Sequence, residues 1–387
     1  MERIERLTSI RGFAALFVFA FHCEISIGGF ELSPWTGALG KGYLGVDFFF
    51  ILSGFILAHV YGERFERGEG RYGRYLRNRL ARFYPLHIAT LLPAVPMIWI
   101  HYGYGRDGVF DATVSSLFGN LFMVHAWGIF DRLSWNFVSW SISAEWFAYL
   151  LFPVLLACTR FAKGRPFFAL GAAFALLALF GWIVARLTGP GILVGGVTLS
   201  SSPHPDRPFD ITYDFALVRV TLEFTAGVLL YRAYAVWRDR GWGRRASGLT
   251  WLGAVALAAL LHFPWPGPPV VHDTLVVILV AGLLLTLALA QGSAQRFCEW
   301  RPFIYLGEIS YAIYMVHGVG LVAIFFLWDL GLPGPGRMVT GLAYTGVFFT
   351  ATLVGAVFLY ECLEKPARAW LRGRSEEQGR GKEIASQ

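Results

Sequence analysis

The chain has 387 residues, of which 56% are hydrophobic and only 15% are charged. Soluble domains usually carry about a quarter charged residues, so this composition excludes an ordinary soluble enzyme. The 33 lysines and arginines exceed the 26 acidic residues. Arginine-rich cytoplasmic loops of a membrane protein explain this excess better than nucleic acid binding does, and no nucleic-acid partner is expected.

Long uncharged runs at 167–184, 275–290 and 340–359 have about the length that crosses a bilayer. In lipid every backbone amide must be paired within the protein, which favours helices, and these runs lack the alternation of a membrane barrel. We therefore predict an all-α polytopic membrane protein, a bundle of about ten transmembrane helices. The expected spans are 8–27, 43–61, 83–101, 135–159, 166–186, 213–236, 249–263, 272–291, 303–328 and 338–362.

Basic residues are distributed unevenly over the segments that join these spans. With the N-terminus inside, the inner segments hold 24 lysines and arginines and the outer segments hold six. This asymmetry predicts that both termini and the 62–82 loop are cytoplasmic. Residues 1–371 are expected to form one membrane domain. Residues 372–387 have no apolar anchor and are expected to be a mobile cytoplasmic tail.

Arg11 and His22 fall within the first expected span, where each ionisable residue costs several kcal/mol unless it has a use or a partner. Arg11 and His22 are eleven residues apart, which places them on one helix face about 16 Å apart. Arg11 could instead extend to the inner headgroups, and His22 could be a hydrogen-bonded core histidine. Together they join an inner cation to a titratable imidazole near the outer half.

Asp47 and Glu145 are carboxylates that also fall within expected spans. Asp47 precedes three phenylalanines and should face the bundle, either as a reacting group or as the structural partner of an arginine. Glu145 is a candidate acid or base, or a group that orients a histidine, and Ser141 shares its helix face. Arg219 and Glu223, an i, i+4 pair, could neutralise each other.

Further polar residues gather at two places. Ser310, Tyr314 and His317 form one stripe of the ninth span, where they could face a substrate or bond to a neighbouring helix. Arg79 and Arg82, at i and i+3 in the expected 62–82 loop, form a fork suited to phosphates, although such a loop also attracts anionic membrane lipid. The four cysteines lack metal-ligand spacing, so no metal is expected.

Six motifs in order give the chain a strong resemblance to a known family over residues 5 to about 370. They are Leu7-Thr8-Ser9-Ile10-Arg11-Gly12 followed by His22, Gly45-Val46-Asp47-Phe48-Phe49-Phe50-Ile51-Leu52-Ser53-Gly54-Phe55, Arg79-Leu80-Ala81-Arg82-Phe83-Tyr84-Pro85, Trp140-Ser141-Ile142-Ser143-Ala144-Glu145, Ser310-Tyr311-Ala312-Ile313-Tyr314-Met315-Val316-His317, and Glu364-Lys365-Pro366. The chain resembles the acyltransferase-3 family of integral membrane O-acyltransferases, which includes O-antigen and exopolysaccharide O-acetylases.

The resemblance implies a multi-pass protein of the bacterial cytoplasmic (inner) membrane that uses acetyl-CoA, or another acyl-CoA, from the cytosol. The acceptor would be a hydroxyl of a carbohydrate or a lipid-linked saccharide. The family's arginine-to-histidine spacing falls on Arg11 and His22, and its paired-arginine motif falls on Arg79 and Arg82. O-acylation needs a base to deprotonate a hydroxyl, a polarised thioester carbonyl and a site from which water is excluded.

We therefore expect His22 to be the base, with Glu145 or Asp47 holding its tautomer, and Arg79 and Arg82 to bind the CoA phosphates. Sequence alone does not rank the two carboxylates. The alternative function is a proton-coupled transporter or flippase, which also uses charged residues within the membrane. A purely structural membrane protein leaves the cost of Asp47, Glu145 and His22 unexplained.

Overall fold

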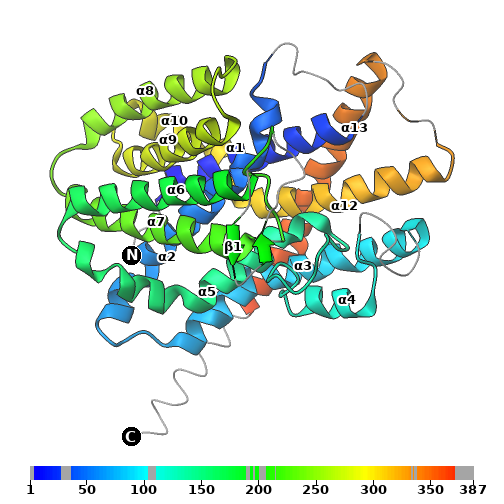
Figure 1. Ribbon diagram of the computed structural model, residues 1–387, viewed down its shortest axis with the longest axis horizontal. Helices are drawn as coiled ribbons and strands as arrows, with labels where there is room; N and C mark the ends of the chain where they lie inside the picture. The colour runs from blue at the N-terminus through cyan, green and yellow to red at the C-terminus, as the bar shows by residue number, and fades with distance from the viewer. Residues whose placement is uncertain are drawn as a thin grey trace, which may run out of the picture.

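The computed structural model describes residues 4–27, 36–102, 110–188, 192–194, 197–199, 206–213, 215–332, 334 and 338–370. The expected tail at 372–387 lies outside these residues. The chain folds into a bundle of helices (Figure 1). Ten helices of the described part have 19 or more residues, and they match the ten expected spans. They are α1 (Glu5–Ser26), α2 (Gly45–Glu66), α3 (Tyr72–Tyr102), α5 (Trp140–Cys158), α6 (Pro166–Thr188), α7 (Ala216–Trp237), α8 (Gly243–His262), α9 (Pro269–Leu289), α12 (Ser310–Asp329) and α13 (Met338–Leu359).

Eight helical segments of the described residues are long and apolar enough to cross a membrane, which confirms an all-α polytopic membrane protein. Helices α7 and α8 are not among the eight. Helix α7 carries Arg219, Glu223 and Arg232 within its length, and α8 begins with Arg244 and Arg245. Most of α7 is buried against other helices, so its charged groups find partners inside the bundle.

Shorter elements join the long helices. They are η1 (Leu39–Leu44), α4 (Val114–Leu121), η2 (Phe137–Ser139), η3 (Arg160–Ala162), a hairpin of β1 (Ile192–Val194) and β2 (Val197–Leu199) with Ile192 opposite Leu199, α10 (Ser293–Cys298), α11 (Arg301–Glu308) and the π-helical turn η4 (Tyr360–Glu364). The short hairpin does not change the all-α class.

Two expected boundaries were wrong. The expected span 303–328 is divided, because α11 ends at Glu308 and α12 begins at Ser310. The expected loop 62–82 is mostly helical, because α2 continues to Glu66 and α3 already begins at Tyr72. The arginine fork therefore lies on a rigid helix, which fixes the direction of its side chains.

Helices α2 and α7 pack with their backbones in contact, through one glycine on each helix. A Cβ atom at Gly54 would overlap the carbonyl oxygen of Phe224, and a Cβ atom at Gly227 would overlap that of Ile51. Small residues allow this close approach in membrane bundles, where van der Waals packing carries much of the association energy.

A buried charge network joins the same two helices. Arg219 on α7 donates from Nε to Asp47 Oδ1 at 3.1 Å and from Nη2 to Asp47 Oδ2 at 2.6 Å, and Asp47 is completely buried. The Glu223 carboxylate lies 3.7 Å from Arg219 Nε. The guanidinium also lies 5.5 Å from the centroid of the Trp140 ring. Asp47 is thus the structural partner of an arginine, and the expected Arg219–Glu223 contact is the longer of the two.

We expect Gly54→Ala to destabilise the protein by about 1–3 kcal/mol, because the added methyl group forces α2 and α7 apart. Thermal unfolding of the detergent-solubilised protein measures this loss. Gly171→Ala on α6 is the matched control, since a Cβ atom there meets nothing within 4 Å. That control should unfold no earlier than the wild type, because alanine is the better helix former. Equal Tm values for the two variants would refute the close-packing role of Gly54.

We expect Asp47→Ala to cost about 3–5 kcal/mol, because it leaves the Arg219 guanidinium buried without its bidentate partner. The same unfolding measurement applies. The control is Glu63→Ala, which breaks the ion pair of Glu63 with Arg67, whose side chains are 54% and 62% exposed. Exposed pairs contribute little, so this control should unfold with the wild type. A Tm for Asp47→Ala equal to that of the control would show that the network is dispensable.

Candidate active site

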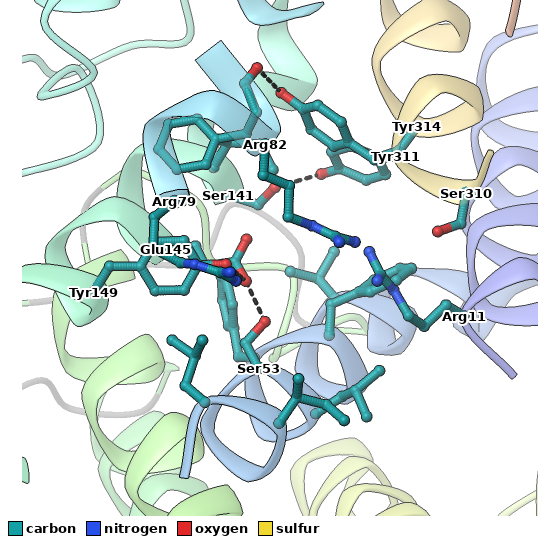
Figure 2. Close-up of a pocket in the computed structure, with 18 residues that line it drawn as sticks. Arg11, Ser53, Arg79, Arg82, Ser141, Glu145, Tyr149, Ser310, Tyr311 and Tyr314 are labelled. Atoms are coloured by element: carbon teal, nitrogen blue, oxygen red, sulfur yellow. Dashed lines mark hydrogen bonds between the residues drawn. The ribbon is translucent and has the colours of Figure 1, made fainter. Parts of the chain in front are cut away.

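A cavity of about 100 Å³ opens among α1, α2, α3, α5 and α12 (Figure 2). We call it the arginine cavity, because three arginines line it and a single carboxylate, Glu145, faces them. Hydroxyl groups make up the rest of its polar wall. They belong to Ser53, Ser141, Tyr149, Ser310, Tyr311 and Tyr314.

The three arginines of this cavity come from two helices. Arg79 and Arg82 lie one turn apart on α3, and Arg11 comes from α1. In Figure 2 the guanidinium groups of Arg11 and Arg82 point toward each other. Arg79 Nη2 donates to the hydroxyl of Tyr61 at 3.2 Å, while its buried Nε has no hydrogen-bond partner among the described residues.

The charge of this cavity is not balanced by the residues around it. In the described part of the chain, none of the three arginines has a carboxylate oxygen within 4 Å. Glu145 accepts hydrogen bonds from Ser53 Oγ and, at 2.5 Å, from the hydroxyl of Tyr149. The three half-buried guanidinium groups repel one another. An anionic ligand would offset this repulsion, so the arrangement favours binding of an anion.

A carboxylate of the last recognised motif lies near the same arginines. Glu364, at the end of the π-helical turn, is completely buried and pairs with Arg368. Its charge also acts on Arg11 and Arg82, although its ion pair is with Arg368. Among the described residues, no cluster of three or more His, Cys, Asp or Glu side chains could hold a metal ion.

A pair of imidazoles lies at the other end of the α1 stripe. His317 Nε2 on α12 is 3.3 Å from His22 Nδ1, and the ring centroids are 5.0 Å apart. His22 Nδ1 also lies 3.0 Å from the carbonyl oxygen of Val18, and His317 Nδ1 lies 3.2 Å from that of Ile313. Both backbone oxygens are acceptors, so each Nδ1 carries the proton when the rings are neutral.

This hydrogen-bond pattern assigns both tautomers. His317 donates from Nδ1 to its helix carbonyl and offers its Nε2 lone pair to the Nδ1–H of His22, which the carbonyl oxygen of Val18 shares. The Nε2 atom of His22 then keeps a free lone pair. The His22 side chain is half-buried, whereas His317 is completely buried. His22 is therefore the member of the pair that can reach a substrate.

Tyr314 connects the arginine cavity to the His22–His317 pair. It lines the cavity, and its ring centroid is 5.4 Å from that of His317. Its hydroxyl is 2.8 Å from Ser141 Oγ and 3.0 Å from the carbonyl oxygen of Val138. The predicted stripe of Ser310, Tyr314 and His317 thus runs from the cavity to the imidazole pair, while Ser310 Oγ donates to Gly307.

The expected support of His22 by a carboxylate does not appear in the structure. Among the described residues, the His22 ring hydrogen-bonds only to Val18 and His317. Glu145 is bonded to hydroxyls in the cavity, and Asp47 is occupied by Arg219. A neutral imidazole takes the expected place of the carboxylate.

Sequence reasoning missed three polar lining residues, Ser53, Tyr149 and Tyr311. A signal existed for Tyr149, which lies four residues after Glu145 on α5 and therefore on the same face. Tyr311 is adjacent to the predicted stripe, and its hydroxyl donates to the carbonyl oxygen of Phe83 at 2.8 Å.

Comparison with known proteins gives one consistent result. The profile of the acyltransferase-3 family, an acyltransferase domain, matches residues 4–361. The acyltransferase MdmB of Streptomyces mycarofaciens is 30% identical over 337 residues, which cover 81% of this chain and 78% of that protein. The putative peptidoglycan O-acetyltransferase YrhL of Bacillus subtilis (strain 168) is 24% identical over 394 residues, which cover 94% of this chain and 55% of that protein.

Protein 2 in the picA locus of Rhizobium radiobacter is 43% identical over 90 residues, which cover 23% of this chain and 43% of that protein. No solved structure gives a significant match. The family profile spans nearly all the helices described above, including those that carry the arginine cavity and the His22–His317 pair. The protein is therefore an acyltransferase and belongs to the acyltransferase-3 family.

Proposed function

We propose that the protein moves an acyl group, in the simplest case acetyl, from cytosolic acyl-CoA to a hydroxyl of a glycan or lipid-linked saccharide. The observation that carries this proposal is the cationic cavity joined through Tyr314 to an imidazole with a free Nε2 lone pair. The name of the Bacillus relative, a putative peptidoglycan O-acetyltransferase, supports a carbohydrate acceptor.

The arginine cavity would receive the donor. Arg79 and Arg82 would bind CoA phosphates with charge-assisted hydrogen bonds, one of them from the unpartnered Nε of Arg79. Positive charge on the inner loops supports a cytoplasmic position for this end and for both termini, in a bacterial inner membrane. The cavity is small, so the thin pantetheine arm, and not the nucleotide, would extend past Tyr314. Its passage would break the Tyr314–Ser141 hydrogen bond.

The transfer step would use His22 as general base. His22 Nε2 takes the proton of the acceptor hydroxyl as its oxygen attacks the thioester carbonyl carbon. Collapse of the tetrahedral intermediate forms the ester, breaks the carbon–sulfur bond and returns the proton from imidazolium to the CoA sulfur. His317 accepts a hydrogen bond from His22 Nδ1–H throughout, which favours the correct tautomer and stabilises the imidazolium.

The alternative function, a proton-coupled transporter or flippase, is not favoured. Such a protein also needs ionisable groups inside the membrane, but the family and both long relatives are acyltransferases. Three arginines around one cavity are also better suited to an anionic donor than to proton transfer, because arginine does not release its proton at physiological pH.

We expect His22→Ala to reduce acyl transfer by at least 100-fold, because the base is lost. The measurement is turnover of labelled acetyl-CoA by the purified protein with and without a peptidoglycan acceptor. His317→Ala should lower kcat while leaving the KM for acetyl-CoA unchanged, and His317→Gln, whose side-chain oxygen can still accept from His22, should restore part of the rate. Thermal unfolding checks that each variant is folded. Near-wild-type turnover of folded His22→Ala would end the general-base assignment.

We expect Arg79→Ala and Arg82→Ala each to weaken CoA binding by about 10- to 100-fold, the value of one charge-assisted hydrogen bond. Calorimetric titration with CoA measures the change, which should shrink as salt is added. Arg74→Ala is the matched control, since Arg74 lies on the same helix but does not line the cavity. Unchanged affinity in both cavity variants would place the CoA site elsewhere.

A further inference from the structure

A second, larger cavity lies on the opposite side of α1 from the arginine cavity. It measures about 620 Å³ and lies among α1, α2, α8, α9 and α10. We call it the lateral groove. Nearly all its lining side chains are apolar, and the hydroxyl of the one threonine, Thr250, is satisfied by the carbonyl oxygen of Ala246 at 2.8 Å. A water molecule would find few hydrogen-bond partners in such a space, so an apolar occupant is favoured there.

Helix α8 shows that the described residues of the chain do not fill the groove. Ala254, Leu257, Ala258 and Leu261 form a stripe at helical spacing that lines the groove. Yet no residue of α8 after Thr250 is buried. The opposite face, with Val255 at 66% exposure, is also uncovered. Figure 1 shows α8 at the rim of the bundle beside α9. Protein interiors are close-packed, so an inward stripe that is only partly covered indicates a missing apolar partner.

The two short stretches of helix at one end of the groove, the start of α8 and α10, each carry an exposed arginine. The first turns of α8 pack on α10, where Trp251 Nε1 donates to Ser293 Oγ at 3.0 Å. Arg244 lies two turns before Trp251 on the same face of α8, and Arg296 immediately precedes the lining residue Phe297. Both arginines are exposed, and neither forms an ion pair within the described residues.

A third arginine in this region, Arg6, is already paired within the protein. Arg6 donates from Nε to the carbonyl oxygen of Leu287 at 2.8 Å and from Nη2 to that of Ala288 at 2.5 Å. It also pairs with Glu299 at 3.2 Å. The local carboxylate is therefore already occupied, and the charge of the two exposed arginines is left for an external anion.

We propose that the lateral groove binds one anionic phospholipid of the surrounding membrane, with an acyl chain along α8 and the phosphate at Arg244 and Arg296. The groove lining extends from Thr250 to Leu261, about 16 Å along the helix, which suits an extended hydrocarbon chain. Apolar burial holds the chain, and the arginines select the headgroup charge. This site is separate from the acyl-transfer site and does not rest on the proposed function.

The test is native mass spectrometry of the full-length protein with phosphatidylglycerol or phosphatidylcholine of the same chain length. We expect the wild type to retain one phosphatidylglycerol in preference to phosphatidylcholine. Ala258→Trp, which fills the groove, should lose it, and Val255→Trp, which adds the same side chain on the outward face, should keep it. Arg244→Gln and Arg296→Gln should each lower the preference about fivefold, whereas Arg160→Gln, an exposed arginine remote in sequence from the groove, should not.

Equal retention of the two lipids by the wild type, or equal retention of phosphatidylglycerol by Ala258→Trp and Val255→Trp, would overturn the proposal. If Ala258→Trp does not fold, wild-type protein is irradiated with phosphatidylglycerol that carries a photoreactive acyl chain. Cross-links on residues 250–261 of α8 and 10–17 of α1 support the site, and cross-links confined to other helices overturn it.

Discussion

A guanidinium inside a membrane bundle must be neutralised, and this constraint determines both how the protein holds together and where it can bind a ligand. Arg219 is neutralised from within, chiefly by Asp47, and the pair fastens α7 to α2 where the backbones already touch. The arginine cavity shows the opposite solution. Its three cations face one carboxylate, Glu145, whose hydrogen bonds go to hydroxyls. The deficit of negative charge is local, and it lies where a phosphorylated donor would enter.

In the proposed reaction, helix α1 separates the cationic donor site from the base, and side chains of α12 connect the two. Arg11 and His22 lie on α1, eleven residues apart, so the donor charge and the base stay about 16 Å from each other. On α12, Tyr314 and His317 bridge that distance with their side chains. Separation on a rigid helix suits a donor whose charged and reactive ends are far apart. It also keeps the positive charge of the arginine cavity away from the imidazole that would accept a proton in the proposed reaction.

The sequence was sufficient for the helices and for the charged residues that line the arginine cavity, because both depend on local pattern. Apolar runs located ten helices, and helical spacing grouped Arg11 with His22 and Arg79 with Arg82, but it did not show that the two groups meet. The prediction from sequence failed for one arginine-rich segment. Its charge indicated a loop, although its backbone is helical and α3 already begins at Tyr72. It also failed on pairing, since nothing in the spacing tells that Asp47 belongs to Arg219 on α7.

The partner of His22 is another contact that the sequence does not predict. A carboxylate was the expected support, but the structure places neutral His317 there, at a sequence separation that no local rule reaches. Helix α1 must then hold His22 against α12 while its other side, with Phe13 and Phe17, faces the lateral groove. A void behind a helix that positions the proposed base leaves that helix free to shift. An apolar occupant of the groove would therefore brace the same helix whose opposite face carries Arg11.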